Sequence, residues 1–142
     1  MNESITYSRT LASIEWAQLK SDLHADSFDN GRTPEQLLTS FENSACFVFA
    51  WCDGRVVGTA RVLSDGVCNA YLIDVWTQSA YRNRGIAREM IRLLTKELRG
   101  QHIYLQADEE NLAFYSKIGF KPQPHGLSKV VGDWLDGSDA QP

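Results

Sequence analysis

The chain has 142 residues, of which 43% are hydrophobic and 23% charged, and its formal net charge is −4. This length and composition are typical of one globular domain that buries a core without disulfides, and the acidic balance argues against general nucleic-acid binding. No apolar run approaches the ~20 residues of a membrane-spanning helix, and the first ten residues lack the pattern of a secretory signal. We therefore expect a cytoplasmic, single-domain protein over residues 1–142, with no metal site and no nucleic-acid or membrane partner.

The predicted elements follow one another along the whole chain. Expected strands lie at 4–9, 45–52, 55–63, 67–77 and 102–107, and one or two more within 127–135 would close the sheet. Expected helices lie at 10–24, 33–44, 86–99 and 108–119. Apolar residues recur at helical spacing in the helices, and apolar runs flank the Asp53-Gly54 pair, which is a strong hairpin signal. Residues 136–142 are expected to form a loose tail.

The order of these elements predicts the fold class. The strand, helix and strand within 67–107 form a βαβ unit, which requires two parallel strands, whereas hairpins link the earlier strands. We therefore predict an α+β fold in three layers. Its central sheet is mixed and mostly antiparallel, with six to seven strands and about four flanking helices.

The stretch YRNRGIA at 81–87 opens the third helix in an unusual way. A helix N-terminus presents unpaired N–H groups and a partial positive charge, and both favour an anion. Gly85 permits close approach of the backbone to a ligand, and Ala87 is small for the same steric reason. Three arginines can add charge-assisted contacts to phosphate oxygens, namely Arg82, Arg84 and Arg88. The pattern indicates a pyrophosphate site, and the alternative is an ordinary loop with solvated arginines.

Two motifs carry a resemblance to a known family. RNRGIA at 82–87 resembles motif A of the GNAT N-acetyltransferase superfamily, written [R/Q]-x-x-G-x-[G/A], whose loop wraps the pyrophosphate of acetyl-CoA. FYSKIGF at 114–120 is similar to a second block of that family, [F/L]-Y-x-x-x-G-F. The resemblance covers most of the chain and implies the GNAT fold and acetyl-CoA as co-substrate. The chain departs from the family pattern at 77–79, where Val-x-Pro is common, and at Asp108, where many members carry an Asn that touches pantetheine.

The resemblance also implies where acetyl-CoA binds. Its pantetheine arm would lie between the strands at 70–77 and 102–107, where backbone N–H groups would pair with it and polarise the thioester. The predicted cofactor-binding residues are Val75, Trp76, Thr77, Arg82, Asn83, Arg84, Gly85, Ile86, Ala87, Arg88, Asp108 and Tyr115.

Tyr115 and Asp74 are the predicted catalytic residues. A phenol with a pKa of ~10 is a reasonable proton donor to a departing thiolate, so Tyr115 is the candidate general acid, and core packing is the alternative. Asp74 lies in an apolar run, where a carboxylate is costly to bury without partners or a chemical role. It could accept the proton of the amine through water, hold a cationic substrate, or make a structural hydrogen bond between strands.

The predicted substrate-binding residues are Phe28, Asp29 and Tyr71. Three aspartates near the first helix, Asp22, Asp26 and Asp29, could attract an amine, and the alternative is a solvated loop. We predict an N-acetyltransferase that moves the acetyl group of acetyl-CoA to a primary amine by direct attack in a ternary complex. A small-molecule amine is favoured because the chain is acidic.

Two other functions remain open from the residues alone. One is acetylation of a protein lysine or N-terminal amine, and the other is a non-catalytic CoA-binding sensor domain. Because GNAT proteins often dimerise, the resemblance also implies that a homodimer can form.

Overall fold

The computed structural model describes residues 4–135, whose strands form one open sheet of order β1-β2-β3-β4-β5. The strands are β1 (Thr6–Ser8), β2 (Cys46–Cys52), β3 (Arg55–Ser64), β4 (Asn69–Thr77) and β5 (His102–Tyr104). The first four strands pair antiparallel in sequence, whereas β4 and β5 pair parallel. The sheet is therefore mixed and mostly antiparallel, as predicted. The tail predicted at 136–142 lies outside the described residues.

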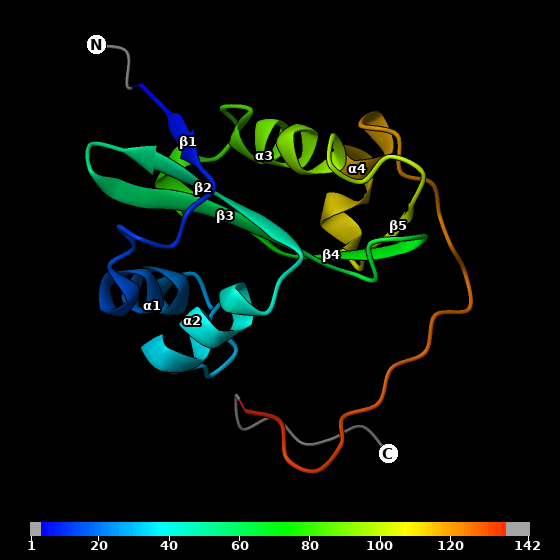
Figure 1. Ribbon diagram of the computed structural model, residues 1–142, viewed down its shortest axis with the longest axis horizontal. Coiled ribbons are helices and arrows are strands. Elements are labelled where there is room, and N and C mark those ends of the chain that lie inside the picture. Colours follow the sequence, from blue (N-terminus) through cyan, green and yellow to red (C-terminus); the bar gives the residue numbers. More distant parts are fainter. Residues whose placement is uncertain (1–3, 136–142) are drawn as a thin grey trace.

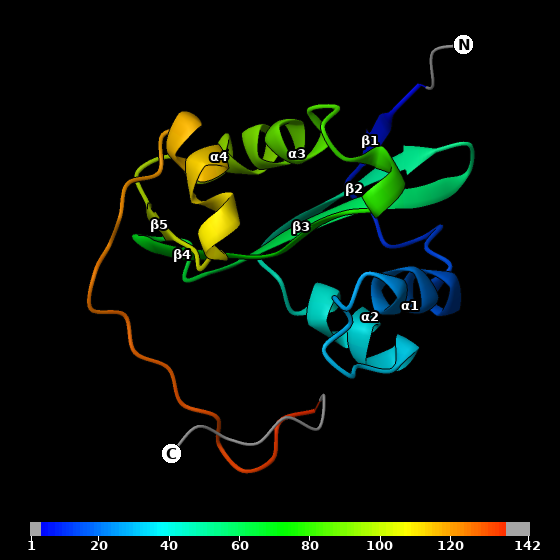
Figure 2. The ribbon, with the colours of Figure 1, turned by 180° about the vertical axis from the view of Figure 1, so that it is seen from behind.

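Helices cover both faces of this sheet. The helices are α1 (Trp16–Ala25), α2 (Pro34–Glu42), α3 (Ile86–Thr95) and α4 (Leu112–Lys117). In Figures 1 and 2, α3 and α4 lie on one side of the sheet, and α1 and α2 lie on the other. Each face has its own buried apolar cluster, one built around α3 and the other around α1 and α2. The arrangement has the three layers and four helices that were predicted.

Local sequence signals explain where two of these elements begin and turn. Thr33 caps α2 in a capping box with Gln36, since each side chain accepts a hydrogen bond from the other's backbone N–H. Proline follows at the first helical position, where its missing N–H is not needed. Asp53 and Gly54 both have positive φ, 50° and 76°, which matches the twist of a two-residue hairpin between β2 and β3.

Helix α3 packs closely onto the middle of the sheet. It buries Ile86, Met90 and Leu94 on one face, which confirms the predicted amphipathic pattern. Gly58 of β3 lies directly beneath, and a Cβ there would come within 3.1 Å of the Met90 Cε. This glycine therefore lets the helix approach the strand, and the close packing fixes where the N-terminus of α3 lies.

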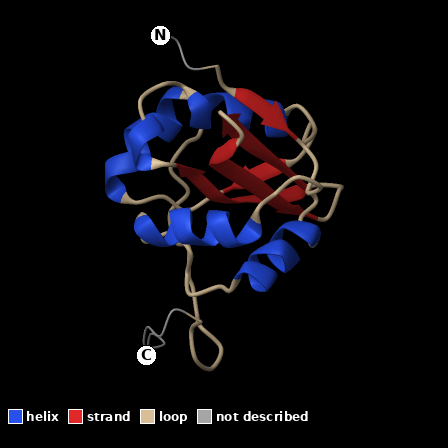
Figure 3. Ribbon diagram, turned by 90° about the vertical axis from the view of Figure 1, so that its left-hand side faces the viewer, coloured by secondary structure: helices blue, strands red, loops and turns tan. Residues whose placement is uncertain are grey.

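The prediction of six to seven strands was wrong for the described part of the chain. Residues 127–135 form no strand, and all of their side chains except the half-buried Val130 are exposed, with Leu127 at 95% and Val131 at 89%. Figure 3 shows this last described stretch leaving the layered body. The strand that it would join, β5, offers a ladder of only three residues, and Pro122 and Pro124 have no N–H to donate to it.

Candidate active site

The site begins where β4 and β5 separate. β5 pairs only with the first three residues of β4, from Asn69 opposite His102 to Tyr71 opposite Tyr104. Beyond Tyr71, β4 continues to Thr77 while the chain after β5 turns away toward α4. A cavity of about 530 Å³ lies at this divergence. Its lining comes from Ser27, Phe28, Asn30, Tyr71, Leu72, Ile73, Asp74, Val75, Leu105, Gln106, Ala107, Asp108, Asn111 and Tyr115.

A β-bulge at Asp74 shapes the β4 wall of this cavity. Thr59 pairs with Trp76 and Arg61 pairs with Ile73, so β4 holds one more residue than β3 across this interval. Asp74 has φ 54°, and its carbonyl accepts a hydrogen bond from the Thr59 hydroxyl at 2.9 Å. Bulges bend the strand that carries them and re-aim its groups, so this one accounts for the change in course of β4 beside the cavity.

The Asp74 carboxylate is held by two buried arginines. Arg32 binds it through both terminal nitrogens, at 2.8 and 3.1 Å, and the Arg61 Nε donates to it at 2.6 Å. Burial alone would raise the pKa of Asp74, but the hydrogen bonds and charges of the two arginines outweigh burial and lower it. A carboxylate with a lowered pKa is a weak base, so the geometry favours the structural alternative for Asp74 over the role of general base.

The start of α3 provides the anion-binding geometry. Gly85 is its N-cap with φ 78°, a left-handed conformation that glycine adopts without strain, and no described side chain caps the helix there. The first N–H groups of the helix, from Ile86 on, therefore point toward solvent or a ligand. Around this N-terminus, Asn83 and the predicted arginines are exposed. We call residues 78–85 the anion loop.

Two arginines of the anion loop already have contacts within the protein. The Arg82 Nε donates to the Thr77 carbonyl at 3.1 Å. The Arg84 guanidinium lies 5.0 Å from the centre of the Tyr81 ring. Both side chains nevertheless lie at the surface beside the N-terminus of α3. Positive charge and helix N–H groups therefore converge on one place, which suits a pyrophosphate.

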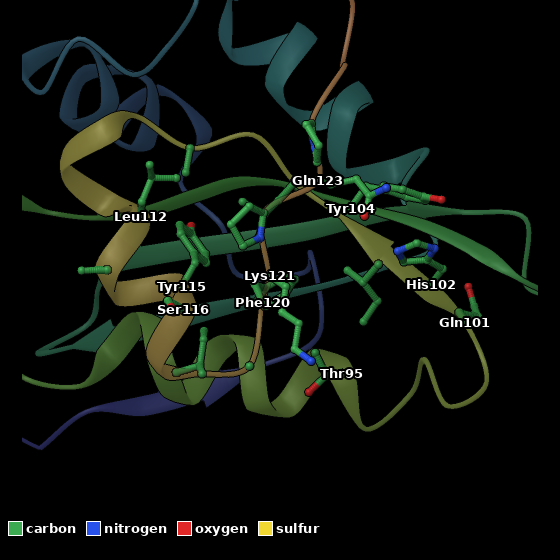
Figure 4. Close-up of a pocket in the computed structure, with 18 residues that line it drawn as sticks. Thr95, Gln101, His102, Tyr104, Leu112, Tyr115, Ser116, Phe120, Lys121 and Gln123 are labelled. Atoms are coloured by element: carbon green, nitrogen blue, oxygen red, sulfur yellow. The ribbon is translucent and has the colours of Figure 1, made fainter.

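Tyr115 links the cavity to a second, larger hollow. This hollow has a volume of about 1120 Å³ and lies along β5, α4 and residues 118–124. Figure 4 shows Tyr115 on α4, with His102 and Tyr104 of β5 across the hollow. The Tyr115 ring packs edge-on against Phe114 and Phe120, with centroids 5.0 and 5.8 Å away. We place the site in the smaller cavity because, of the two, only that cavity is lined by the part of β4 that does not pair with β5.

Burial sets the protonation state of Tyr115. It raises the pKa of the phenol above its ordinary value, so that the hydroxyl keeps its proton throughout the neutral range. The ring contributes to core packing, as the alternative held, and the residue also lines the cavity. Core packing and a role in the cavity are therefore compatible for Tyr115.

The structure separates the predicted substrate-binding residues. Phe28 and Tyr71 both line the cavity, whereas Asp29 does not. The Asp29 carboxylate is buried and pairs with Lys20 and, at 3.4 Å, with His24. Burial would raise the pKa of Asp29, but the hydrogen bond and charge of Lys20 outweigh it and lower that pKa. Asp29 thus shapes the α1–α2 loop, and its geometry does not support the predicted contact with substrate.

The other two aspartates that were considered as amine attractors are also paired. Asp22 is buried and accepts two hydrogen bonds from Arg55 of β3, one of them at 3.0 Å. Asp26 accepts hydrogen bonds from Trp76 and from the anion loop. Neither a solvated loop nor an open attractor describes them, because internal partners satisfy all three carboxylates.

Two of the predicted cofactor residues, Trp76 and Ile86, are buried and can act only through their backbones. Trp76 is 2% exposed and packs with α1 and α2, and Ile86 of α3 is equally buried in the cluster on the other face of the sheet. Val75 and Asp108 line the cavity, together with Asn111. Among the described residues, no cluster of His, Cys, Asp or Glu could hold a metal ion.

Sequence reasoning did not identify Arg32 and Arg61 as the partners of Asp74. Arg61 stands in the apolar run of β3, and a charged residue in such a run indicates a buried partner. That signal could have been used. Arg32 lies in a polar loop 42 residues before Asp74, and nothing local distinguishes it from a solvated arginine.

The chain is similar to known acetyltransferases. Residues 10–120 match the model of the acetyltransferase (GNAT) family. A candidate acetyltransferase from Deinococcus radiodurans R1 has a similar structure, with a TM-score of 0.78, 28% identity and 87% of each chain covered. No described helix is long and apolar enough to cross a membrane.

Two curated relatives match about half of the chain. Histone acetyltransferase TAP1 of Glycine max is 33% identical over 76 residues, which are 51% of this chain and 33% of the relative. Serotonin N-acetyltransferase 2, chloroplastic, of Oryza sativa subsp. japonica is 34% identical over 77 residues, which are 52% of this chain and 38% of the relative. The matches therefore span only about a third of each relative's length. Because the family model matches most of the length of this chain, the chain belongs to the GNAT acetyltransferase family.

Proposed function

We propose that this protein is an N-acetyltransferase that moves the acetyl group of acetyl-CoA to a primary amine by direct attack in a ternary complex. The observation that carries the proposal is the convergence of two features at one edge of the sheet. The half of β4 that does not pair with β5 borders a cavity. The N-terminus of α3, with its exposed arginines, lies just beyond the end of that strand. The family to which the chain belongs uses acetyl-CoA.

The residues present fit the chemistry of that co-substrate. The N–H groups at the start of α3 and the arginines of the anion loop would hold its pyrophosphate, and the free edge of β4 near Val75 would hold its amide-bearing arm. When bound, acetyl-CoA supplies the acyl group as a thioester. Tyr115 carries a proton that its raised pKa preserves at neutral pH, and its position on the cavity wall suits donation to a leaving sulfur.

A small-molecule amine is the favoured acceptor. The cavity volume of about 530 Å³ falls within the range of small-ligand pockets, and the aromatic rings of Phe28 and Tyr71 form part of its wall. The relatives carry both kinds of name, one a serotonin and the other a histone acetyltransferase, so a protein amine is the second candidate. A sensor domain without chemistry would need neither Tyr115 nor an acceptor cavity.

The test begins with calorimetric titration of acetyl-CoA. Aryl, polyamine and amino-sugar acceptors and a lysine peptide are then added in turn, and release of the CoA thiol is followed. Binding with release for a small amine is the expected result. Release with the peptide alone would favour the protein acceptor, and binding without any release would favour the sensor. Absence of acetyl-CoA binding would reject the proposal.

A pair of charge reversals assigns any binding to the anion site. Arg88→Glu places a negative charge in the first turn of α3, and we expect acetyl-CoA affinity to fall at least about tenfold. Arg99→Glu makes the same charge change beyond the other end of that helix and serves as the control. Equal losses for both variants would mean that net charge, and not this site, governs binding.

A further inference from the structure

Asp26 follows α1 directly and lies against the anion loop. Its Oδ2 accepts a hydrogen bond from the Trp76 Nε1 at 2.9 Å and another from the backbone N–H of Ser79 at 3.1 Å. The Arg82 guanidinium lies 3.8 Å from the same oxygen. One carboxylate oxygen thus joins the end of the first helix to the end of β4 and to the start of the anion loop.

These contacts act on the part of the loop that sets the direction of Arg82. The side chain of Asp26 is only 11% exposed, so its bonds are largely shielded from water. Arg82 is held on its other side by the Thr77 carbonyl, and Gln78 is tied to β3 through the Val57 carbonyl at 2.8 Å. Asp26, which follows α1, therefore connects that helix to the loop. It accepts hydrogen bonds from Trp76 and Ser79 and lies close to the Arg82 guanidinium.

We infer that Asp26 is a positioning residue for the pyrophosphate site, which it serves by fixing the anion loop so that Arg82 and the N-terminus of α3 face one anion. This inference rests on the proposed function and extends it to a residue of another element. Asp26 does not line the cavity, and its carboxylate would repel a pyrophosphate rather than bind it. The hydrogen bonds of Asp26 favour pyrophosphate binding because they fix the loop, whereas its negative charge opposes that binding.

Two substitutions separate the hydrogen bonds from the charge. Asp26→Ala removes both. Asp26→Asn removes the charge, while its amide oxygen can occupy the place of Oδ2 and accept from both Trp76 and Ser79. Positioning therefore predicts that the alanine variant binds acetyl-CoA about tenfold more weakly than wild type, and that the asparagine variant binds it at least as tightly as wild type.

Asp22→Ala is the matched control. Asp22 is a buried aspartate of α1 and, like Asp26, has an arginine partner, but that arginine lies on β3 and not on the anion loop. The control variant should lose thermal stability and keep its affinity for acetyl-CoA. A merely structural role of Asp26 would give the same result as the control.

A variant that leaves Asp26 intact provides an independent check. Ser79→Pro removes the N–H that donates to Asp26, at the first residue of a short 3₁₀-helix, where proline is tolerated. It should also weaken acetyl-CoA binding. Calorimetric affinities and thermal unfolding are measured for all variants and the wild type.

The outcomes separate this inference from the proposed function. Wild-type affinity in Asp26→Ala and Ser79→Pro would overturn the inference, as would equal losses in Asp26→Ala and Asp22→Ala. Tighter binding by both Asp26 variants would also overturn it, because repulsion by the charge would then dominate. If the wild type itself does not bind acetyl-CoA, the proposed function is rejected and the inference with it.

Discussion

Tyr115 is the residue whose chemistry can be tested most directly. Tyr115→Phe removes the hydroxyl and keeps the ring that packs against Phe114 and Phe120. We expect kcat to fall about a hundredfold, which is the lower end of the usual contribution of a general acid, while KM for acetyl-CoA stays constant. Because burial raises the pKa of the phenol, the wild-type rate should decline through loss of this proton only above pH ~10.

Steady-state kinetics across a pH series measure both effects. Tyr104→Phe is the control, since Tyr104 lies on β5 and lines only the larger hollow. Full turnover by Tyr115→Phe at every pH would show that the hydroxyl is not the proton donor.

Asp74 gives a prediction about stability and not about chemistry. Asp74→Asn leaves two buried arginine charges without a carboxylate, and we expect the free energy of unfolding to fall by about 3 kcal/mol at neutral pH. The folded pKa of Asp74 is lowered, so its contribution is present above the unfolded value of about 3.9 and is lost as the pH falls through the folded pKa. The difference between wild type and variant should therefore shrink in acid.

Urea unfolding at several pH values checks this prediction. Asp53→Asn, at an exposed hairpin turn that accepts either residue, is the control and should change stability little. Activity offers a second readout, because a general base at position 74 would give the rate an acid-side decline that the variant lacks. If that decline disappears in Asp74→Asn, the structural interpretation is wrong.

At the scale of elements, the sequence predicted the turns and the order of helices and strands better than the ends of the helices. The Asp-Gly hairpin and the βαβ unit were both confirmed. The hairpin depends on two adjacent residues, and the βαβ unit follows from the order of strand, helix and strand along the chain. The helix boundaries were less accurate. The first helix was expected from residue 10 but begins at Trp16, and the third was expected to end at 99 but ends at Thr95. Propensity alone places such ends within a few residues.

The candidate site was predictable to the extent that motifs mark it. The anion loop and Tyr115 could be singled out because they carry the family motifs; in the structure the loop precedes α3, and Tyr115 lines the cavity beside β4. The partners of Asp74 were not predictable, because Arg32 and Arg61 come from separate parts of the chain and meet only in the folded protein. The role of Asp26 depends likewise on contacts 50 and 53 residues along the chain.

The left-handed start of α3 yields a prediction about this element. Gly85 has φ 78°, and a Cβ there would meet no protein atom within 4 Å. Gly85→Ala should therefore cost about 1 kcal/mol of stability through backbone strain and not through a clash. The added methyl group would lie at the anion site, so we also expect weaker binding of acetyl-CoA.

Gly66→Ala is a closely matched control for that variant. Gly66 has φ 77°, also has no protein atom within 4 Å of an added Cβ, and lies in the turn between β3 and β4. Unfolding in urea should show similar losses for both variants, whereas calorimetry should show reduced affinity for Gly85→Ala alone. Unchanged affinity in Gly85→Ala would place the ligand away from this glycine.

At the scale of the whole molecule, two features lack a packing partner among the described residues: the apolar side chains near residue 135 and the outer edge of β5. Leu127, Val131 and Leu135 are 95%, 89% and 61% exposed, which is unusual for apolar residues so close together. Within residues 4–135, no backbone hydrogen bond joins 121–135 to the sheet. No strand of the described part of the chain lies beside the outer edge of β5, and the hollow of about 1120 Å³ runs along that edge. Open edges of this kind recruit other strands.

These two features together predict a homodimer in which residues 127–135 of each copy add to β5 of the other. The chain's own residues 121–124 line the hollow but include two prolines, so they cannot complete the ladder themselves. A second copy brings the same exposed segment in a self-complementary exchange. Sedimentation should therefore give about twice the chain mass of 16.0 kDa.

Two variants of this segment decide whether it forms the interface. Val131→Asp places a charge on an apolar position and should give a monomer, because a buried unpaired carboxylate is costly. Ser128→Asp adds the same charge three residues earlier, where alternation along a strand directs the side chain to the opposite face, and it should remain a dimer. A wild type that sediments as a monomer would contradict the exchange, and so would a dimer that both variants retain, since the contact would then lie elsewhere on the molecule.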